Sequence, residues 1–414
     1  MKRAFILLVL VSQAVCAQPR MSLDNCIEYA LEHNLQLKQQ QIAVASEEDA
    51  LVQSKLGLLP SVGLGADYSL SREQTRLGGS LTVNMTLFDG LLGQRRVESA
   101  YLSLAKARNA SVIREMELKI AVTKAFLSCL LARRASRLAD ESYRSVLLQR
   151  DFIAKKVDAG DRPAGAMAEI DAEVAATYSL TVSKAGEALL AQIDLTQLLE
   201  WDGPLPFDIE EPEEEALEPP SADYTLIIGD AAFLPAVSDS EYELELARKQ
   251  LQIAQSGLFP TLTASAGINT FYYPEISDSF GVQIKNNYLF SGVFTLSVPI
   301  FNHYSAATAV KNAKGAVRIR ELQLKRDILE AQKELQLAVN QANVFYQNYL
   351  ASARKRDAAT EALRISTKKL ESGLAAVSDW ILSRDKYSEA QNEYTATYYQ
   401  YLFQIKILGY YLEY

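Results

Sequence analysis

Residues 56–70 read LGLLPSVGLGADYSL, and two different hydrophobic periods meet within them. Before Pro60 the apolar residues recur about every seven positions, as in a helix that packs along one stripe; they are Leu23, Ala30, Leu37, Val44, Leu51 and Leu58. After Pro60 they recur at every second position, at Val62, Leu64, Ala66, Tyr68 and Leu70. The pattern predicts a helix that ends at a proline and continues as a strand.

The same transition returns in SGLFPTLTASAGINT, residues 256–270, so Pro60 corresponds to Pro260 at an offset of 200. Two further pairs of segments match at an offset of 213; they are LTVNMTLFDG (81–90) with FTLSVPIFNH (294–303), and KKVDAG (155–160) with KKLESG (368–373). The offset changes between two strand patterns, where a loop tolerates an insertion. The sequence therefore predicts a tandem duplication.

Each copy is predicted to form a helix, two strands, a very long helix and a final helix. The first copy places them at 22–58, 61–71, 80–88, 90–157 and 164–200, and the second at 236–258, 261–273, 290–301, 303–370 and 376–412. The longest helices would extend about 100 Å. A seven-residue series in the last helix predicts coiled-coil packing; it comprises Tyr387, Tyr394, Tyr401 and Leu408. The expected fold class is mainly α, with long helical hairpins and a small membrane β part.

The predicted domains are a signal peptide (1–17), a first repeat (18–200), an acidic Pro-rich linker (201–235) and a second repeat (236–414). The signal peptide is predicted from a basic start, a short apolar stretch and the small-residue site Val15-Cys16-Ala17. Lipidation of Cys16 is the rival interpretation. The linker is expected to be a solvated connector, with an acidic binding tail as the alternative.

The composition argues against several functional classes. The chain carries 51 acidic and 42 basic residues, a net charge of −9, which disfavours a nucleic-acid partner. Only two histidines occur, His33 and His303. This small number disfavours a zinc site with several His ligands and catalysis by a histidine general base. Cys26 and Cys129 lie in apolar helical patterns and are expected to be small buried hydrophobic residues. We expect no enzymatic activity, no cofactor and no metal site.

The strands are predicted to face lipid with their apolar side. Each alternates apolar with small or polar residues over about ten positions, long enough to cross a bilayer when tilted. The residues expected to face lipid are Leu64, Tyr68, Leu81, Val83, Met85, Phe294, Leu296 and Val298. Four strands leave open edges that lipid cannot satisfy, so the chain must assemble. Two copies would give eight strands and three would give twelve, of which only the larger barrel leaves a water-filled bore.

Several motifs resemble those of the TolC-like outer-membrane efflux proteins. LDNCIEYALEHNLQL (23–37) is similar to the opening helix of that family. GLLPSVGL and GLFPTLTA resemble its helix-to-strand junctions, and TLFDG and PIFNH resemble its strand-to-helix junctions. DAGDRPAGAMAEI and ESGLAAVSDWILS resemble its two hairpin tips. The order, duplication and spacing of these motifs cover nearly the whole mature chain.

The resemblance implies a homotrimer with a twelve-stranded β-barrel in outer-membrane lipid and an α-helical tunnel in the periplasm. It implies the exit duct of a tripartite efflux or type I secretion system, engaged by a periplasmic adaptor (membrane fusion protein) and an inner-membrane pump. Carried over by position, the adaptor-docking hairpin tips contain Asp158, Gly160, Asp161, Glu371 and Gly373.

Carried over in the same way, Asp379 matches a constricting acid ring at the periplasmic gate, although it could equally be a solvated helix-start residue. The chain departs from the family pattern at Leu370, Ala375 and Leu382. A polar link is therefore not expected at this gate.

A soluble periplasmic coiled-coil scaffold or adaptor is the alternative function. Such a protein would need no barrel, and charged residues on the apolar faces of the strands would favour it. None occurs at the positions named above. Paired acids such as Glu47 and Glu48 could suggest an enzyme, but they lie on a predicted helix with no pocket implied.

Overall fold

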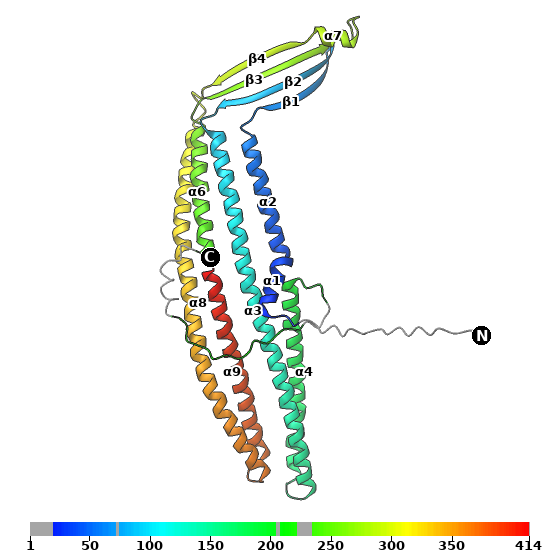
Figure 1. The fold of residues 1–414 in the computed structure, drawn as a ribbon, viewed down its shortest axis with the longest axis vertical. Helices are drawn as coiled ribbons and strands as arrows, with labels where there is room; N and C mark the ends of the chain where they lie inside the picture. The colour runs from blue at the N-terminus through cyan, green and yellow to red at the C-terminus, as the bar shows by residue number, and fades with distance from the viewer. Residues whose placement is uncertain (1–19, 72–73, 204–207, 222–233, 414) are drawn as a thin grey trace, which may run out of the picture. The chain divides into compact units, whose positions relative to one another are not determined.

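The computed structural model describes residues 20–71, 74–203, 208–221 and 234–413 (Figure 1). The first half forms α1 (Leu23–His33), α2 (Leu35–Leu56), β1 (Ser61–Leu70), β2 (Thr75–Phe88), α3 (Leu92–Asp158) and α4 (Gly165–Leu199). The second forms α6 (Pro235–Ser256), β3 (Thr261–Tyr272), α7 (Phe280–Asn286), β4 (Leu289–Ser297), α8 (Ser305–Glu371) and α9 (Val377–Leu412). The mainly α fold class, the order of the elements and the switch at both prolines are confirmed.

The opening helix and the loop after β3 differ from the prediction in kind, while β2 begins earlier than predicted, at Thr75, and β4 ends earlier, at Ser297. The opening helix is not continuous but breaks at Asn34, whose φ and ψ of −58° and 123° are not helical. The break leaves the amide of Leu35 without a helical partner, and the carboxylate of Glu200 accepts its hydrogen at 3.0 Å. The loop after β3 contains the short helix α7, in which the Gln283 side chain is buried and bonds both the amide and the carbonyl of Tyr273.

The chain divides into two compact units, and each draws on both halves of the sequence. The strand unit comprises Gln36–Met116 and Ala222–Val339, with Glu413–Tyr414. It contains α2, α6, α7, all four strands and the first parts of α3 and α8. The hairpin unit comprises Met1–Leu35, Glu117–Ser221 and Asn340–Leu412. It contains α1, α4, α9 and the remaining parts of α3 and α8. The complete helices α3 and α8 are 67 residues long each.

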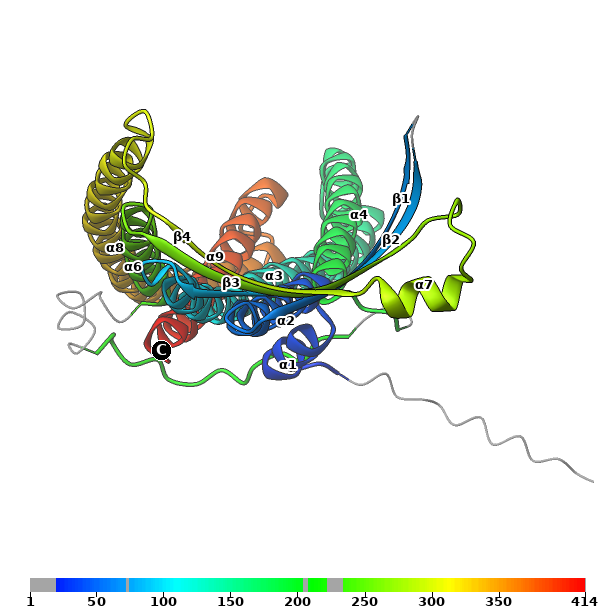
Figure 2. The same cartoon turned by 90° about the horizontal axis from the view of Figure 1, so that it is seen from above.

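The four strands form one antiparallel sheet in the order β1-β2-β3-β4 (Figure 2). The central pairing joins the two halves of the chain, since β2 lies against β3 from Leu77↔Tyr272 to Thr86↔Thr263. The register shifts between Thr86 and Phe88, close to the start of α3. Strands β1 and β4 are the two edges of this sheet.

An aromatic core holds the hairpin unit together. Phe126, Leu130, Leu195, Leu199, Tyr398, Tyr399 and Phe403 are each at most 2% exposed and come from α3, α4 and α9. Cys26 and Cys129 lie in the same core as free, fully buried thiols, as predicted. Burial, with Cys129 nearby, raises the pKa of Cys26 to about 12, and burial raises that of Cys129 to about 11. Both thiols are therefore neutral and packed as small apolar groups.

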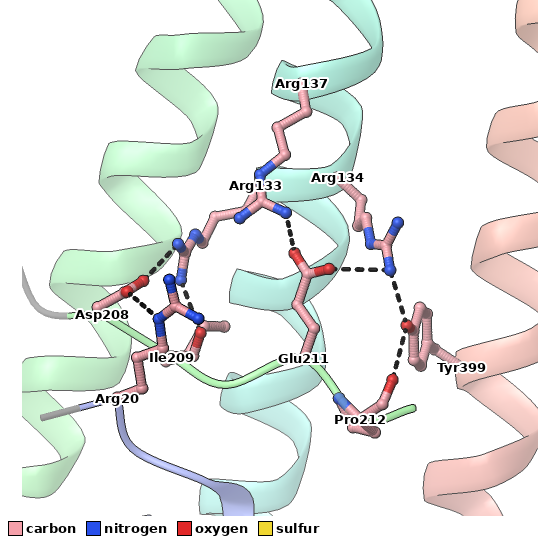
Figure 3. A network of polar contacts seen from close by, with 9 residues as sticks. All are labelled: Arg20, Arg133, Arg134, Arg137, Asp208, Ile209, Glu211, Pro212 and Tyr399. Atoms are coloured by element: carbon pink, nitrogen blue, oxygen red, sulfur yellow. Dashed lines mark hydrogen bonds and ion pairs between the residues drawn. The ribbon is translucent and has the colours of Figure 1, made fainter. Parts of the chain in front are cut away.

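Residues 208–221, which we call the strap, are anchored to the helices at several points, four of which Figure 3 shows, although most of their side chains stay exposed. Ile209 is 3% exposed and packs into the aromatic core, and it pairs with Met21 in a parallel β-bridge. Arg133 binds Asp208 at 2.5 Å, and Arg134 binds Glu211 at 2.8 Å. The expected solvated connector is therefore also anchored, because arginines on α3 supply charge partners for Asp208 and Glu211. The rest of the linker up to α6, residues 222–233, lies outside the described residues.

Candidate functional site: the sheet faces and the hairpin turns

The register places most of the apolar strand residues on one face of the sheet, although Phe271, Leu289 and Val293 belong to the other face. One row reads Leu64, Leu81, Ile268, Phe290, and the next reads Val62, Val83, Ala266, Gly292. The rows between them belong to the other face and are small or polar, as in Gly63, Thr82, Gly267, Ser291. The alternation read from single strands thus becomes two chemically distinct surfaces, one apolar and one polar.

The apolar face is uncovered in the single chain. Leu64, Tyr68, Phe294 and Leu296 are between 65% and 87% exposed, Leu81 and Met85 less so, and Val83 is half-buried. These seven predicted residues lie in strands. Val298 lies one residue beyond the end of β4, because Pro299 follows and cannot donate to a strand ladder. Among the described residues, no helix is both long enough and apolar enough to cross a bilayer.

The two hairpin turns have the same backbone geometry. Gly160 and Gly373 follow α3 and α8 with φ of 76° and 74°, a left-handed conformation that favours glycine. In the first turn the amide of Asp161 donates to the carbonyl of Lys156 at 2.9 Å, and the equivalent bond in the second turn measures 2.8 Å. Each turn therefore ends its helix with a Schellman-type cap.

The acidic residues predicted at the turns are exposed. Asp158, Asp161 and Glu371 project from the turns, and Asp161 forms an ion pair with Lys156 at 3.2 Å. Asp379 is exposed in the first turn of α9, where its carbonyl accepts a hydrogen bond from the Ser383 hydroxyl. Negative charge is favourable at this end of a helix.

A polar link joins the two turns, contrary to the sequence expectation. The guanidinium of Arg162, in the first turn, donates to the carbonyls of Leu370 and Ala375 in the second, at 2.9 and 3.1 Å. Leu370 and Ala375 are the positions whose apolar side chains argued against such a link. Their backbone oxygens make it instead, which no side-chain pattern can reveal.

Sequence reasoning also missed Arg384, a buried charge beside the turns. Its side chain is 7% exposed, and it bonds Glu173 on α4 at 2.6 Å and also Asp385. Nearby, the indole of Trp380 donates to Thr367 at 3.1 Å within an apolar cluster that includes Ile153 and Ile170. Arg384 lies on the buried stripe of α9 among apolar residues, and this placement was its only signal.

Nothing in the described parts of the chain gathers three or more His, Cys, Asp or Glu side chains in a position to hold a metal ion. His33 stacks on Tyr29, with ring centroids 4.0 Å apart, and shares a hydrogen bond with the Tyr29 carbonyl at 3.0 Å. His303 lies near Phe301 in the β4–α8 junction. Both histidines thus pack against an aromatic ring, His33 at the end of α1 and His303 between β4 and α8.

Comparison with known proteins identifies the fold. A family model described as outer membrane efflux protein matches residues 234–405. The chain is similar to VceC of Vibrio cholerae, an outer membrane protein, with 17% identity and a TM-score of 0.77 over 94% of this chain and 96% of that one. It is also similar to the outer membrane channel CmeC of Campylobacter jejuni, with 13% identity and a TM-score of 0.80 over 94% and 85%.

The open state of the outer membrane channel MtrE of Neisseria gonorrhoeae is 16% identical, with a TM-score of 0.80 over 94% of this chain and 88% of that one. No curated protein matches the sequence. The family model covers the second repeat, and the solved structures share the fold of both repeats. Residues 234–405 thus match the outer membrane efflux protein family, the family that the sequence motifs resemble, and both repeats share the fold of the outer membrane channels named above.

Proposed function

We propose that this protein is the outer-membrane exit duct of a tripartite efflux or type I secretion system. Three copies close their four-stranded sheets into a twelve-stranded barrel, and their helices form a tunnel in the periplasm. Small molecules or proteins pass through by diffusion, without covalent chemistry. The observation that carries the proposal is the sheet with one exposed apolar face, one polar face and two edge strands.

The physical argument starts from the edges. A sheet in lipid with unpaired edge strands leaves backbone groups unsatisfied, which costs several kcal/mol for each group. Closing β4 of one copy against β1 of the next removes both edges. The apolar face then meets lipid, and the polar face lines a bore that twelve strands make wide enough for water.

The hairpin turns are the proposed site of adaptor docking and gating. Asp158, Asp161 and Glu371 present exposed charge to a periplasmic adaptor, and Gly160 and Gly373 shape the turns. Asp379, repeated three times around the axis, forms an acid ring that favours cations. Opening requires an inner-membrane pump and its adaptor to move the helices near these turns apart.

Neighbouring residues on opposite faces of β2 provide a matched test. Leu81→Arg places a charge against lipid at a cost of about 2–4 kcal/mol near the bilayer centre, whereas Thr82→Arg places it in the wet bore. We expect Leu81→Arg to reduce the trimer extracted from outer membranes several-fold more than Thr82→Arg does. The measurement is the mass and amount of the unheated particle in detergent. A water-soluble wild-type monomer would support the scaffold alternative and exclude the duct.

A deletion strain tests transport itself. Loss of the protein should raise sensitivity to exported toxic compounds or stop the secretion of a substrate, and the wild-type gene should restore both.

Asp379→Asn should change the conductance and cation preference of the reconstituted channel while leaving the trimer intact. Unchanged ion selectivity would remove Asp379 from the gate.

A further inference from the structure

The loop between β3 and β4 is organised around one buried side chain. Gln283 on α7 is 3% exposed. Its Nε2 atom donates to the carbonyls of Tyr273 and Asp278 at 3.1 and 2.9 Å, and its Oε1 atom accepts the amide hydrogen of Tyr273 at 2.9 Å. At the start of the loop, the carboxylate of Glu275 accepts the amide hydrogen of Thr75 on β2 at 2.9 Å. These hydrogen bonds hold α7 in one position relative to the sheet.

The strand register shows on which face of the sheet α7 lies. Thr270 and Tyr272 are two and four positions after Ile268, so their side chains share its apolar face. The Thr270 hydroxyl donates to the carbonyl of Ile284 at 2.9 Å. The ring of Tyr272 meets that of Phe280 edge-on, with the ring centroids 5.1 Å apart. Figure 2 shows α7 on the convex side of the curved sheet, next to β3. The helix therefore packs on the apolar face.

The polar face at the same level of the sheet is not covered by α7. Asp67, Arg76 and Phe271 alternate with the apolar residues and thus belong to the polar face. Arg76 donates to Asp67 at 3.4 Å, and its guanidinium lies over the ring of Phe271, 4.6 Å from the centroid. The two charged side chains are 40% and 57% exposed. In a closed barrel this pair faces the bore, whereas α7 lies outside it.

The exposed surface of α7 continues the apolar face of the strands. Phe280 and Val282 on α7 and Tyr288 just after it are 51%, 46% and 66% exposed. On the apolar face of the strands, Tyr68 and Phe290 are 67% and 68% exposed. Aromatic side chains gather in this way where a barrel meets the interface between lipid and water.

The position of α7 along the strands matches that interface. β3 has 12 residues, or about 40 Å at 3.3 Å per residue, and a tilt of about 45° reduces its height to about 28 Å. The apolar band of a membrane barrel is about 25 Å tall. Because α7 follows the end of β3 that is opposite to α6, it lies at the interface away from α6. Lys285, exposed in its last turn, can reach lipid phosphates from that level.

We propose that α7 and the residues next to it bind the outer leaflet of the outer membrane, as an interfacial anchor on the outside of the barrel. Phe280, Val282 and Tyr288 lie between the headgroups and the acyl chains, and Lys285 meets lipid phosphate. The occupant is lipid because α7 shares the face of the sheet that meets lipid. This role rests on the barrel of the proposed function, and it keeps the β3–β4 loop out of the bore.

A disulfide pair tests the placement of α7. Upon oxidation, Tyr272→Cys should form a disulfide with Phe280→Cys faster than Phe271→Cys does, because Phe271 lies on the opposite face. The two pairs have nearly the same separation along the chain, so the comparison isolates the face. The measurement is the loss of thiols that react with a maleimide, followed by mass. Cys26 and Cys129 are fully buried and do not interfere. Equal rates, or a faster rate with Phe271→Cys, would refute the placement.

Spin labels test the contact with lipid. The intact oligomer is reconstituted in vesicles of phosphatidylethanolamine and phosphatidylglycerol, with a label at Val282→Cys, Leu64→Cys or Thr82→Cys. Leu64 is the control for the lipid face and Thr82 the control for the bore. Oxygen concentrates in lipid, whereas a nickel chelate stays in water. We expect the ratio of oxygen to nickel collisions at Val282 to exceed that at Thr82 several-fold and to lie nearer to that at Leu64.

The other outcomes separate the anchor from the duct. Nickel collisions at Val282 as frequent as those at Thr82 would place the loop in water and refute the anchor. Few collisions with either reagent would show that protein covers α7, which also refutes the anchor. In both cases a lipid signature at Leu64 leaves the duct intact. A label at Leu64 that contacts water would refute the barrel, and the anchor with it.

Discussion

Arg384 shows how a single residue can stabilise the hairpin unit. Its guanidinium joins α9 to α4 through Glu173, although its Nε and Nη1 atoms have no hydrogen-bond partner in the described part of the protein. Taking a guanidinium out of water is costly, and only a close carboxylate compensates for it. The pair therefore contributes more to holding two helices in one arrangement than to net stability.

Replacing one member of the Glu173–Arg384 pair should destabilise the protein more than replacing both members. We expect Glu173→Leu to lower the free energy of unfolding by about 3 kcal/mol, because it leaves Arg384 buried without its main counter-charge. The double variant Glu173→Leu with Arg384→Leu should recover a large part of that loss. Denaturant unfolding of the detergent-extracted protein provides the measurement. A double variant as unstable as the single one would show that the pair itself is strongly stabilising.

At the scale of elements, the hairpin turns depend on backbone conformation. A Cβ on Gly160 would meet no atom within 4 Å, so its φ of 76° is the sole obstacle to a side chain. Gly160→Val should cost about 1–2 kcal/mol, and Gly160→Asn should cost clearly less, because asparagine tolerates the left-handed region. Thermal unfolding of the two variants measures the difference. If both variants lost the same stability, a contact outside the single chain would be responsible.

The α3–α6 packing predicts a dependence on pH. A hydrogen bond from Lys106, at 2.6 Å, lowers the pKa of Glu243 below 4.5, and Arg320 adds to this effect while burial opposes it. Because the folded-state pKa is depressed, the stabilisation is present above the unfolded pKa and is lost as the pH falls through the folded one. Neighbouring Asp239, whose pKa burial raises, acts in the opposite direction.

Comparison with a variant isolates Glu243 from Asp239. Between about pH 6 and pH 3, wild type should lose more thermal stability than Glu243→Gln, which lacks the titrating group. At neutral pH, Glu243→Gln should melt at a lower temperature than wild type. Melting curves across this range give the measurement. Parallel curves for the two proteins would mean that Glu243 has an ordinary pKa.

At the scale of the whole molecule, the strap binds an acidic stretch of chain to the helices. Glu211 pairs with Arg134 and Arg137, and Tyr398, Tyr399 and Tyr401 on α9 donate their hydroxyl hydrogens to strap carbonyls. Glu211→Ala should raise the rate of proteolytic cleavage in residues 208–221 several-fold. Exposed Glu213→Ala, with the same loss of charge, should leave the rate unchanged. Equal rates in both variants would show that the tyrosines hold the strap without the ion pairs.

Much of the fold was predictable because its signals are local. The strands β1 and β3 begin directly after Pro60 and Pro260, as the change of period required, and α9 has its predicted last residue, Leu412. The buried cysteines followed from their apolar neighbours. The break at Asn34 was not predictable, because the partner of the freed amide, Glu200, is 165 residues away. Arg162 was missed for the same reason, since it binds backbone oxygens of a distant turn.

The sequence by itself determined the duplication, the types of the elements and the apolar face of each strand. These depend on periodicity and on proline and glycine preferences, which act within a few residues. Only the tertiary structure decided that the strap is anchored to the helices and that the two hairpin turns are linked. Such contacts are hydrogen bonds and ion pairs between residues that lie far apart in the chain. The periodicity of the sequence does not show which of these residues come together in the fold.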